Sequence, residues 1–525
     1  MNLDGLYSAS NILDPSCFSS LSSHEMSQKQ PQNRDARPYR PFPRHAAPSP
    51  STQERILLRA VGKPPSMPHG AVSYPTAGQF FEQPIPFFRQ PIPVLPHPQL
   101  SVLKPTASPS SSIVTRMSSA QIPNIPLTSP QVEDCVARDL EGNVFSTSFD
   151  FTSLLFPGAR LPFPVDVRLF HHLSKPHSYG EGKKPLWDLK NSMFLNIPTK
   201  PTEVEVCNWM NAIGEAMGGL YQQEPKRLWW AGNRNIAVAG SHVQRKPDLI
   251  LVERLDYHHI SNPPYVHTDW THVHAFAEAT SQSKSTRIDK TINVKTYLMF
   301  RCCPTRRFVI ALSFTRKEHR LQFGLTITDH EGQIRWAAQD ILGPGSFVGT
   351  RILTILTFLF FRSRSDLGLD PYVKINARGD PTMITVDGQE FQVVEPIYSL
   401  DSFLGRGTHV WLVTKDGNRY IIKDSWIQED RVTSEVVFLQ KMAAHPEIHG
   451  CVPELICGGD VVINGLKDST SVYRGGVIGK PRSSRLHRRI VISPVGEPLL
   501  TIHSPHEFLQ VLISLIRSMS SAYIW

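Results

Sequence analysis

The sequence has few cysteines and lacks the spacings that cysteines show in zinc sites and disulfide-bonded domains. Its 525 residues include seven cysteines, an odd number, and no pair is separated by two residues. This argues against a disulfide framework and against a thiolate zinc site. Because unpaired thiols are typical of reducing compartments, we expect a cytoplasmic or nuclear protein.

Long hydrophobic runs are also missing. The first residues, MNLDGLYSASNILD, lack the basic start and apolar core of a secretory signal. The most apolar stretch, residues 352–361, has ten residues, whereas a membrane-spanning helix needs about 20. We therefore expect no membrane partner and predict a buried helix for this stretch.

Charge is scarce and scattered. Charged residues make up 19% of the chain and the formal net charge is +9. The first 130 residues hold 11 Lys and Arg against 6 Asp and Glu, so 11 − 6 = +5 of that charge lies there. A basic arm can contact nucleic acid, but this one has no basic block. The pattern therefore argues against nucleic acid as a partner.

Proline is abundant, and it is concentrated at one end. Residues 1–130 contain 22 of the 44 prolines, which interrupt every helix or strand that could start there. We predict a disordered Pro/Ser-rich arm over residues 1–150. Its PIPFF and PIPVLP pieces (84–88 and 91–96) could present polyproline II to a protein partner; the alternative is a passive tail.

Residues 151–383 have the mixed pattern of an α/β domain. The apolar spacing in 201–217 and the run in 346–361 predict helices. Alternating or continuous apolar residues predict strands at the following ranges, the last holding two strands around a His-Glu-Gly turn: 248–255, 271–280, 307–314 and 321–339.

Residues 384–525 begin as a series of strands. Asp-Gly pairs at 387–388 and 416–417 predict tight hairpin turns. A helix is predicted over 431–444, and RRIVISPVGEPLL (488–500) reads as a strand that enters a turn. The last helix is predicted to begin at Pro505, with Ser504 as its cap and Glu507 completing a capping box.

One stretch of this second region, FLGRGTHVWLVTKDGNRYIIKDSW (403–426), has the features of a phosphate-binding loop. Gly405 and Gly407 would let the backbone approach a phosphate, with Val410 next to them. Lys423 lies in the following strand and could neutralise phosphate oxygens, but it needs a counter-ion. Glu435, on the inward face of the next predicted helix, is the candidate.

Each of these residues has an ordinary interpretation when it is taken alone. Two glycines are common in hairpins, and a strand lysine can extend along the sheet edge into water. Their order decides between the interpretations. A glycine loop, a strand Lys and a helix Glu in that order are the ATP-holding parts of a protein kinase small lobe, although a third glycine is missing here.

The segments GRGTHVW, YIIKDSW and ISPVGEPL resemble the fungal-type protein kinase domain family. Upstream segments agree in order with the extension that precedes the kinase core in that family, namely RKPDLILV, EATSQSKS, CPTRRFVIALSF and GLDPYV. The resemblance covers residues 200–525. It implies ATP-dependent phosphoryl transfer to protein Ser/Thr, with Gly405 and Gly407 over the phosphates, Lys423 on them and Glu435 orienting Lys423. ATP is the implied cofactor, and Mg²⁺ accompanies it in the family.

The resemblance stops before the residues that perform phosphoryl transfer. A kinase needs an Asp beside the accepting hydroxyl and an Asp for Mg²⁺. The His487–Arg488 pair lies on a predicted strand, the segment 329–332 (DHEG) is a predicted turn, and the chain stops at Trp525. We therefore predict no catalytic residue and no Mg²⁺ ligand here, and expect the polypeptide to be inactive. The alternative function is a pseudokinase-like binding module.

A second alternative comes from the upstream domain. Asp248 opens a predicted strand, and Glu278 lies about 30 residues later on another one. An Asp followed by Glu-x-Lys on adjacent strands holds Mg²⁺ in PD-(D/E)xK nucleases. Position 280 is Thr, however, and Lys284 could substitute only if the chain bends back. This pattern predicts a nuclease-like topology that serves as structure, with an active nuclease as the less favoured interpretation.

Two further groups of residues attract attention. His272, His274 and Glu278 would share one face of a strand, near His258, His259 and His267, which suggests either a metal site or a polar sheet face. The last helix presents a broad apolar surface that a protein partner could cover, formed by Phe508, Leu509, Leu512, Ile513, Leu515 and Ile516.

The predicted fold class is α+β. It combines the disordered arm, a nuclease-like α/β domain over 151–383, and a kinase-like small lobe with an incomplete large lobe over 384–525. The predicted nucleotide site comprises Gly405, Gly407, Val410, Lys423 and Glu435.

Overall fold

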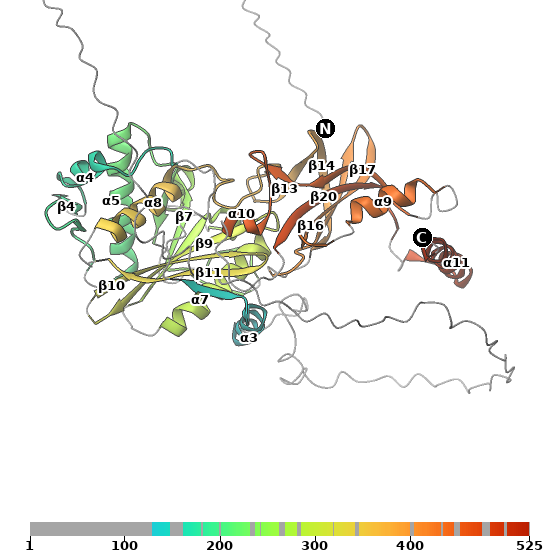
Figure 1. The fold of residues 1–525 in the computed structure, drawn as a ribbon, viewed down its shortest axis with the longest axis horizontal. Coiled ribbons are helices and arrows are strands. Elements are labelled where there is room, and N and C mark those ends of the chain that lie inside the picture. Colours follow the sequence, from blue (N-terminus) through green and yellow to red (C-terminus); the bar gives the residue numbers. More distant parts are fainter. Residues whose placement is uncertain are drawn as a thin grey trace, which may run out of the picture. The chain divides into compact units, whose positions relative to one another are not determined.

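The computed structural model describes residues that all belong to one compact unit within 102–525. The described ranges are 129–147, 161–179, 182–198, 201–231, 237–241, 243–261, 268–280, 285–318, 320–341, 346–399, 404–431, 434–445, 452–474, 484–497 and 501–523. The proline-rich pieces of the arm lie outside them. The structure contains both helices and strands (Figure 1), so the predicted mixed α+β class is confirmed.

The first sheet has seven strands in the order β1-β11-β10-β9-β8-β7-β6. Only the β8–β9 and β1–β11 pairs are parallel. The parallel pair β8–β9 requires a crossover, which helix α7 supplies. The bounds are β6 Arg227–Trp230, β7 Leu249–Glu253, β8 Ala275–Thr280, α7 Ser285–Cys302, β9 Phe308–Lys317, β10 Arg320–Asp329 and β11 Gly332–Asp340.

Helices cover both faces of this sheet (Figure 1). On one face, α5 (Glu203–Tyr221) and α8 (Ser346–Phe361) pack their apolar side chains with those of the strands. On the other face, α7 packs through residues such as Ile292 and Leu298. The predicted buried helix at 352–361 is confirmed, because it is part of α8 in the larger core.

Residues 129–147 belong to this domain, although the sequence pattern placed them in the arm. Helix α3 (Ser129–Leu140) buries Val132, Cys135 and Val136 against the α7 side of the sheet, and β1 (Val144–Thr147) pairs with β11. These elements are short and follow a proline-rich stretch, so only the tertiary partners reveal them. Smaller elements complete the domain: α4 Val167–Leu173, β2 His177–Ser178, β3 Lys183–Lys184, β4 Trp187–Asp188, β5 Met193–Phe194 and α6 Arg254–Ser261.

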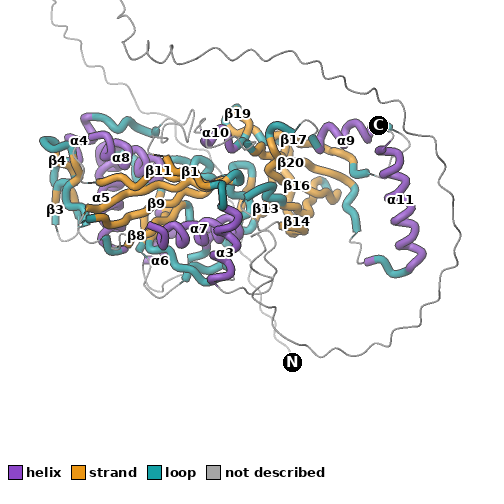
Figure 2. The backbone as a smooth tube through the Cα atoms, turned by 60° about the horizontal axis from the view of Figure 1, so that its bottom comes forward, coloured by secondary structure: helices purple, strands orange, loops and turns teal. Residues whose placement is uncertain are grey.

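The second sheet has seven antiparallel strands in the order β12-β13-β14-β15-β16-β20-β17. Helix α9 (Glu435–Ala443) connects β16 to β17 and lies beside β17 in both views (Figure 2). The strands are β12 Val373–Ile375, β13 Pro381–Val386, β14 Gln389–Ser399, β15 His409–Lys415, β16 Asn418–Gln428, β17 Glu454–Asp460 and β20 Arg485–Ser493. Between β17 and β20 the chain forms β18 (Val462–Ile463), β19 (Leu466–Lys467) and α10 (Thr470–Arg474).

The predicted hairpin turns of the second sheet are confirmed. Asp387 and Gly388 have φ of +47° and +76°, and Asp416 and Gly417 have φ of +51° and +78°. Two consecutive residues with positive φ form the turn whose twist matches antiparallel strands. Asp tolerates this left-handed region better than most residues, and Gly enters it without strain.

Two predicted elements start later than the sequence pattern indicated. Residues 271–274 are not strand, because η2 (Trp270–His272) is a 3-10 helix capped by Asp269 and β8 begins at Ala275. Helix α9 begins at Glu435, where Ser434 accepts a hydrogen bond from the Val437 amide. A capping side chain fixes the N-terminal end of a helix. The pattern of apolar residues by itself does not show where such a cap lies.

The last helix, α11 (Pro505–Tyr523), has the predicted cap. The Glu507 amide donates to Ser504 Oγ at 3.1 Å, and Glu507 Oε2 accepts from the His503 amide. Phe508, Leu509 and Ile516 of this helix are exposed, as predicted. In the described residues, no helix is both long enough and apolar enough to cross a membrane.

Candidate functional site

Lys423 and Glu435 meet on one face of the second sheet, which we call the front face. Lys423 lies in β16 opposite Val410 of β15, and Glu435 is the first residue of α9. Lys423 Nζ lies 2.6 Å from Glu435 Oε1, with 26% and 33% of the two side chains exposed. The lysine is therefore fixed by a carboxylate while part of it stays open to solvent, as a ligand-binding ammonium needs to be.

The glycine loop leads into β15 beside this pair. Gly405 has φ +99°, and a Cβ added there would meet nothing within 4 Å, so the backbone faces open space. Gly407 has φ +42°, and a Cβ there would lie 2.7 Å from the His330 ring of the first sheet domain. Gly405, Gly407 and Val410 thus lie before and at the start of β15, Lys423 lies opposite Val410 in the middle of β16, and Glu435 contacts Lys423 from α9. Their role in binding a nucleotide stays a prediction.

The opposite face of the same sheet, the back face, carries a chain of buried charges. His487 contacts Asp468 Oδ2 through Nδ1 at 2.7 Å and Asp424 Oδ1 through Nε2 at 2.6 Å. Asp468 also accepts a hydrogen bond at 3.0 Å from Arg307, the residue directly before β9, and Asp424 accepts one from Arg489. All five side chains are buried. Because Arg307 belongs to the first sheet domain, this network joins the two sheets.

Protonation of His487 follows from its two carboxylate partners. Burial alone would lower the pKa of His487, but the charge of Asp424 and the hydrogen bonds to Asp424 and Asp468 raise it to about 9. The pKa of Asp424 lies well below its usual range, because Arg489 and His487 outweigh the effect of burial. The back face therefore holds alternating charges that compensate one another.

Asp370, Asp424 and His487 are close enough together to ligate a metal ion. However, the Arg489 guanidinium already lies between the two carboxylates, with Nη2 2.5 Å from Asp370 Oδ2 and Nε 3.2 Å from Asp424 Oδ2. A metal ion would have to displace this cation, so the group does not fit Mg²⁺. It is also on the wrong face to serve Lys423.

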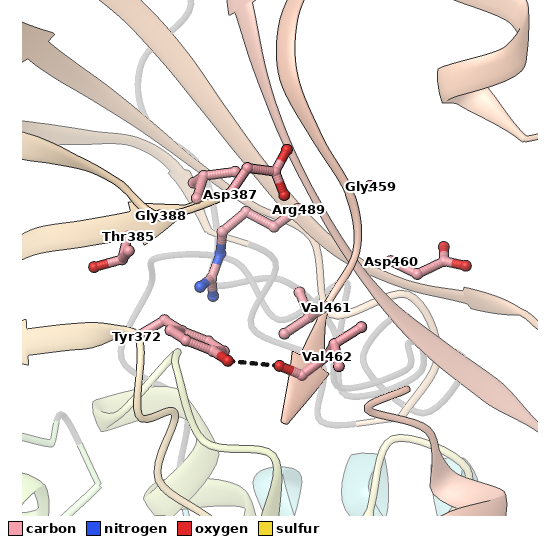
Figure 3. Close-up of a pocket in the computed structure, with 10 residues that line it drawn as sticks. Tyr372, Thr385, Asp387, Gly388, Gly459, Asp460, Val461, Val462 and Arg489 are labelled. Carbon is pink, nitrogen blue, oxygen red and sulfur yellow. Dashed lines mark hydrogen bonds between the residues drawn. The ribbon is translucent and has the colours of Figure 1, made fainter. Parts of the chain in front are cut away.

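A pocket of about 190 Å³ opens on the back face. Its lining includes Tyr372, Asp387, Gly459, Val462 and Arg489, and the Tyr372 hydroxyl donates to the Val462 carbonyl at 2.6 Å. Figure 3 shows the Arg489 guanidinium between Tyr372 and the turn at Gly388. Arg489 pairs with Asp424, whereas Lys423 points to the other face, so this pocket is not the predicted nucleotide site.

In the first sheet, the structure brings together Asp248, Glu278 and a lysine that the sequence pattern missed. Asp248 Oδ2 accepts from the Ala279 amide at 2.7 Å, and Lys295 of α7 forms a short hydrogen bond to Glu278. Glu278 and Lys295 are both buried. Burial raises the pKa of Glu278 to about 7; the Lys295 charge opposes the shift and the Asp248 charge adds to it.

The position of Lys295 left a signal in the sequence. Residues 288, 292, 295 and 299 have the spacing of one buried helix face. Lys295 is the charged member of this series, and the other three are Ile288, Ile292 and Met299. A lysine in such a series requires a buried counter-ion. Thr280 lies in β8 as expected, and Lys284 lies outside the described residues.

Within the described residues, His272, His274 and Glu278 do not share one strand face, so neither alternative for them, a metal site or a polar sheet face, is found there. His272 lies in the 3-10 helix η2 and contacts the Ala377 carbonyl, not the face of β8 that carries Glu278. His274 Nε2 lies 3.0 Å from Glu253 Oε1, and burial lowers the pKa of His274 to about 3. His258 is exposed on α6, His267 is outside the described residues, and only the backbone of His259 is described. The strand that would have aligned these side chains begins too late.

Two segments, His487–Arg488 and 329–332, resemble parts of a kinase catalytic loop in sequence, but neither belongs to the front face that carries Lys423. His487 is part of the buried back-face network, and Arg488 pairs with Asp460. The 329–332 segment is the β10–β11 turn, where Asp329 accepts from the amides of Glu331 and Gly332 and is held by Arg474. Both predictions from the sequence, a strand and a turn, are confirmed.

Comparison with known proteins agrees with this arrangement. The model of the fungal protein kinase family matches residues 246–524, which is more than half of the chain and includes Lys423, Glu435 and the Asp248–Glu278 region. No curated protein and no solved structure matches the chain. The chain therefore belongs to the fungal protein kinase family.

Proposed function

We propose that the front face of the second sheet binds ATP, with Lys423 on the phosphates and Glu435 holding Lys423. The observation that carries this proposal is the 2.6 Å contact between these two side chains. In protein kinases the corresponding Lys lies on the third strand of the small lobe and its Glu on the next helix. Here β14, β15 and β16 are followed by α9, so the order of elements is the same.

The residues around Lys423 fit a nucleoside triphosphate. The open backbone at Gly405 allows a phosphate to approach, and Val410, half-buried and paired with Lys423, offers an apolar surface for the rest of the ligand. An ammonium held by one carboxylate can attract further oxygens as a point charge. Within the described residues, the cluster of three His, Cys or acidic side chains that is close enough to ligate one metal ion is the back-face group, and Arg489 already occupies it.

We infer that a polypeptide of these 525 residues binds the nucleotide without transferring its phosphate, as a pseudokinase-like module. Phosphoryl transfer depends on a base for the accepting hydroxyl and on carboxylates for Mg²⁺. The His487–Arg488 and Asp329–Gly332 segments, which come nearest to these elements in sequence, are committed to the back-face network and to a turn.

ATP binding to the full chain tests this function. We expect calorimetry to detect saturable ATP binding that weakens about tenfold or more in Lys423→Met. Lys415→Met is the matched control, since Lys415 lies at the far end of β15 beside Gln389 and should leave the affinity unchanged. A wild-type chain that does not bind ATP contradicts the proposal. If the wild type transfers phosphate and Lys423→Met abolishes the transfer, the proposal that the chain is non-catalytic is wrong, while the proposal that it binds ATP stands.

A second candidate function is metal-dependent phosphodiester cleavage by the first sheet. The observation that favours it is Lys295, which supplies from α7 the lysine that is absent at position 280. The carboxylates of Asp248 and Glu278 are oxygen ligands of the kind that Mg²⁺ takes. Asp248 comes directly before β7, Glu278 lies in β8, and these two strands pair with each other, an arrangement that supports the predicted nuclease-like topology.

DNA cleavage in the presence of Mg²⁺ tests this second candidate. This candidate predicts cleavage of supercoiled plasmid that is lost in Glu278→Gln and in Lys295→Met. Glu253→Gln is the control, because Glu253 is a partly buried carboxylate at the end of β7 that pairs with Arg227. If the folded wild-type chain leaves the plasmid intact, Lys295 and Glu278 are a structural ion pair.

A further inference from the structure

The glycine loop of the second sheet is anchored on the first sheet domain. The Gly405 amide donates to the His330 carbonyl at 2.9 Å. Leu404, the residue before it, packs against the cluster of apolar side chains that α3 and α7 form on the first sheet. A loop that approaches phosphates would otherwise be free to move, so these two contacts define where its glycines lie.

The His330 ring fixes the other side of the loop. It stacks on Trp426 of β16, with ring centroids 4.6 Å apart, and Trp426 stacks on His487 at 4.7 Å. Gly407 crosses the edge of the His330 ring so closely that a Cβ would clash at 2.7 Å. The Trp426 amide donates to the Arg406 carbonyl at 2.6 Å, which ties the loop to the same strand as Lys423.

The turn that presents His330 is itself rigid. Asp329 accepts from two amides within the turn and from Arg474 through two hydrogen bonds. Glu331 accepts from Thr470, and both Arg474 and Thr470 lie on α10, between β17 and β20. The ring is buried, and its Nε2 faces the Arg306 carbonyl at 3.4 Å. His330 therefore stands on a fixed support.

We propose that His330 is a positioning residue for the nucleotide site, through which the first sheet domain sets the phosphate loop over Lys423. This rests on the proposed function of the Lys423 site. Because preorganised backbone binds a ligand without the entropic cost of ordering it, loss of the anchor lowers affinity for the phosphates and leaves the rest of the nucleotide unaffected.

Affinity for ATP and for adenosine, measured on the full chain, tests the proposal. In His330→Ala we expect the ATP Kd to rise about tenfold and the adenosine Kd to stay constant. His330→Phe keeps a flat ring against Gly407 and Trp426, so it should restore ATP affinity. Leu321→Ala is the control for general destabilisation, because Leu321 is buried near the opposite end of β10.

Several outcomes would overturn the proposal. An unchanged or tighter ATP Kd in His330→Ala means that the ring does not place the loop for phosphate binding. An equal loss of ATP and adenosine affinity means that His330 is only structural.

Tryptic cleavage after Arg406 separates this inference from the proposed function, since it needs no nucleotide. The anchored loop of the wild type should be cut slowly, and His330→Ala should speed the cut without changing cleavage elsewhere. Equal rates at Arg406 overturn the anchor whether or not ATP binds. A wild type that does not bind ATP contradicts the proposed function, and with it the role of the anchor in phosphate binding.

Discussion

Lys423 and Asp424 are neighbours in β16, yet they lie in opposite environments. On the front face, Lys423 forms one partly exposed ion pair with Glu435. On the back face, Asp424 contacts two buried cations, Arg489 and His487. A partly exposed pair contributes little to stability and can exchange partners, whereas removal of one member of a buried network leaves charges without compensation. The difference indicates that the back face holds the two sheets together, and it agrees with the proposed ligand site on the front face.

The largest difference in the free energy of unfolding should appear when Asp424 and Lys423 are replaced one at a time. We expect Asp424→Asn to lower the free energy of unfolding by about 3–5 kcal/mol, because Arg489 and His487 remain buried with less negative charge. Lys423→Met should lower it by under about 1 kcal/mol. Urea denaturation of both variants measures this, and equal losses would erase the contrast between the faces.

The next effect is the response of the back face to alkaline pH. His487 has a folded pKa of about 9, above the ordinary value of 6.5. Its contribution is therefore complete below pH 6.5 and is lost as pH rises through 9. We expect the free energy of unfolding to fall by up to about 1.4 kcal/mol per pH unit in this window. Urea denaturation at each pH in His487→Gln provides the comparison, and a variant with the wild-type slope would show that His487 is not the group that titrates.

Acid should act on a different set of histidines. Burial lowers the pKa of His330 and His274 to about 3 and that of His409 to about 4, so they fold as neutral rings. Their contribution is present above pH 6.5 and is lost as pH falls through 4 for His409 and through 3 for His330 and His274.

His330→Phe keeps an aromatic ring but removes the titrating group. The free energy of unfolding of this variant should therefore fall less steeply than that of the wild type as pH is lowered below 6.5, which we call the acid limb. His258→Gln, at an exposed position, should leave that limb as it is. An acid limb that both variants leave unchanged would assign the acid sensitivity to other groups.

The smallest effect concerns the helix that carries Glu435. Ser434 caps α9, and Ser434→Ala should lower the free energy of unfolding by about 1 kcal/mol and also weaken ATP binding, because Glu435 follows the cap directly. Ser504→Ala removes the matching cap of α11 and should have a similar cost without a change in ATP affinity. If both variants bind ATP equally well, the position of Glu435 does not depend on its cap.

Local chemistry made part of the fold and site predictable. The Asp-Gly turns, the Ser504 cap and the buried helix at 352–361 each follow from a few adjacent residues. The expected contact of Lys423 with Glu435 was also readable, because period-two and period-3.6 patterns place both side chains on the face between sheet and helix. The expected strand over 271–274 failed because the capping side chain of Asp269 outweighed the alternation of apolar residues.

The sequence by itself determined the class of the chain, its hairpins and the lysine–glutamate pair, since these depend on residues within a dozen positions of one another. Only the tertiary structure decided that Lys295 meets Glu278, that α3 and β1 join the first sheet, and that His330 lies under the glycine loop. These contacts join segments far apart in the chain. Their partners are selected by burial and charge compensation in the folded core, which no local pattern encodes.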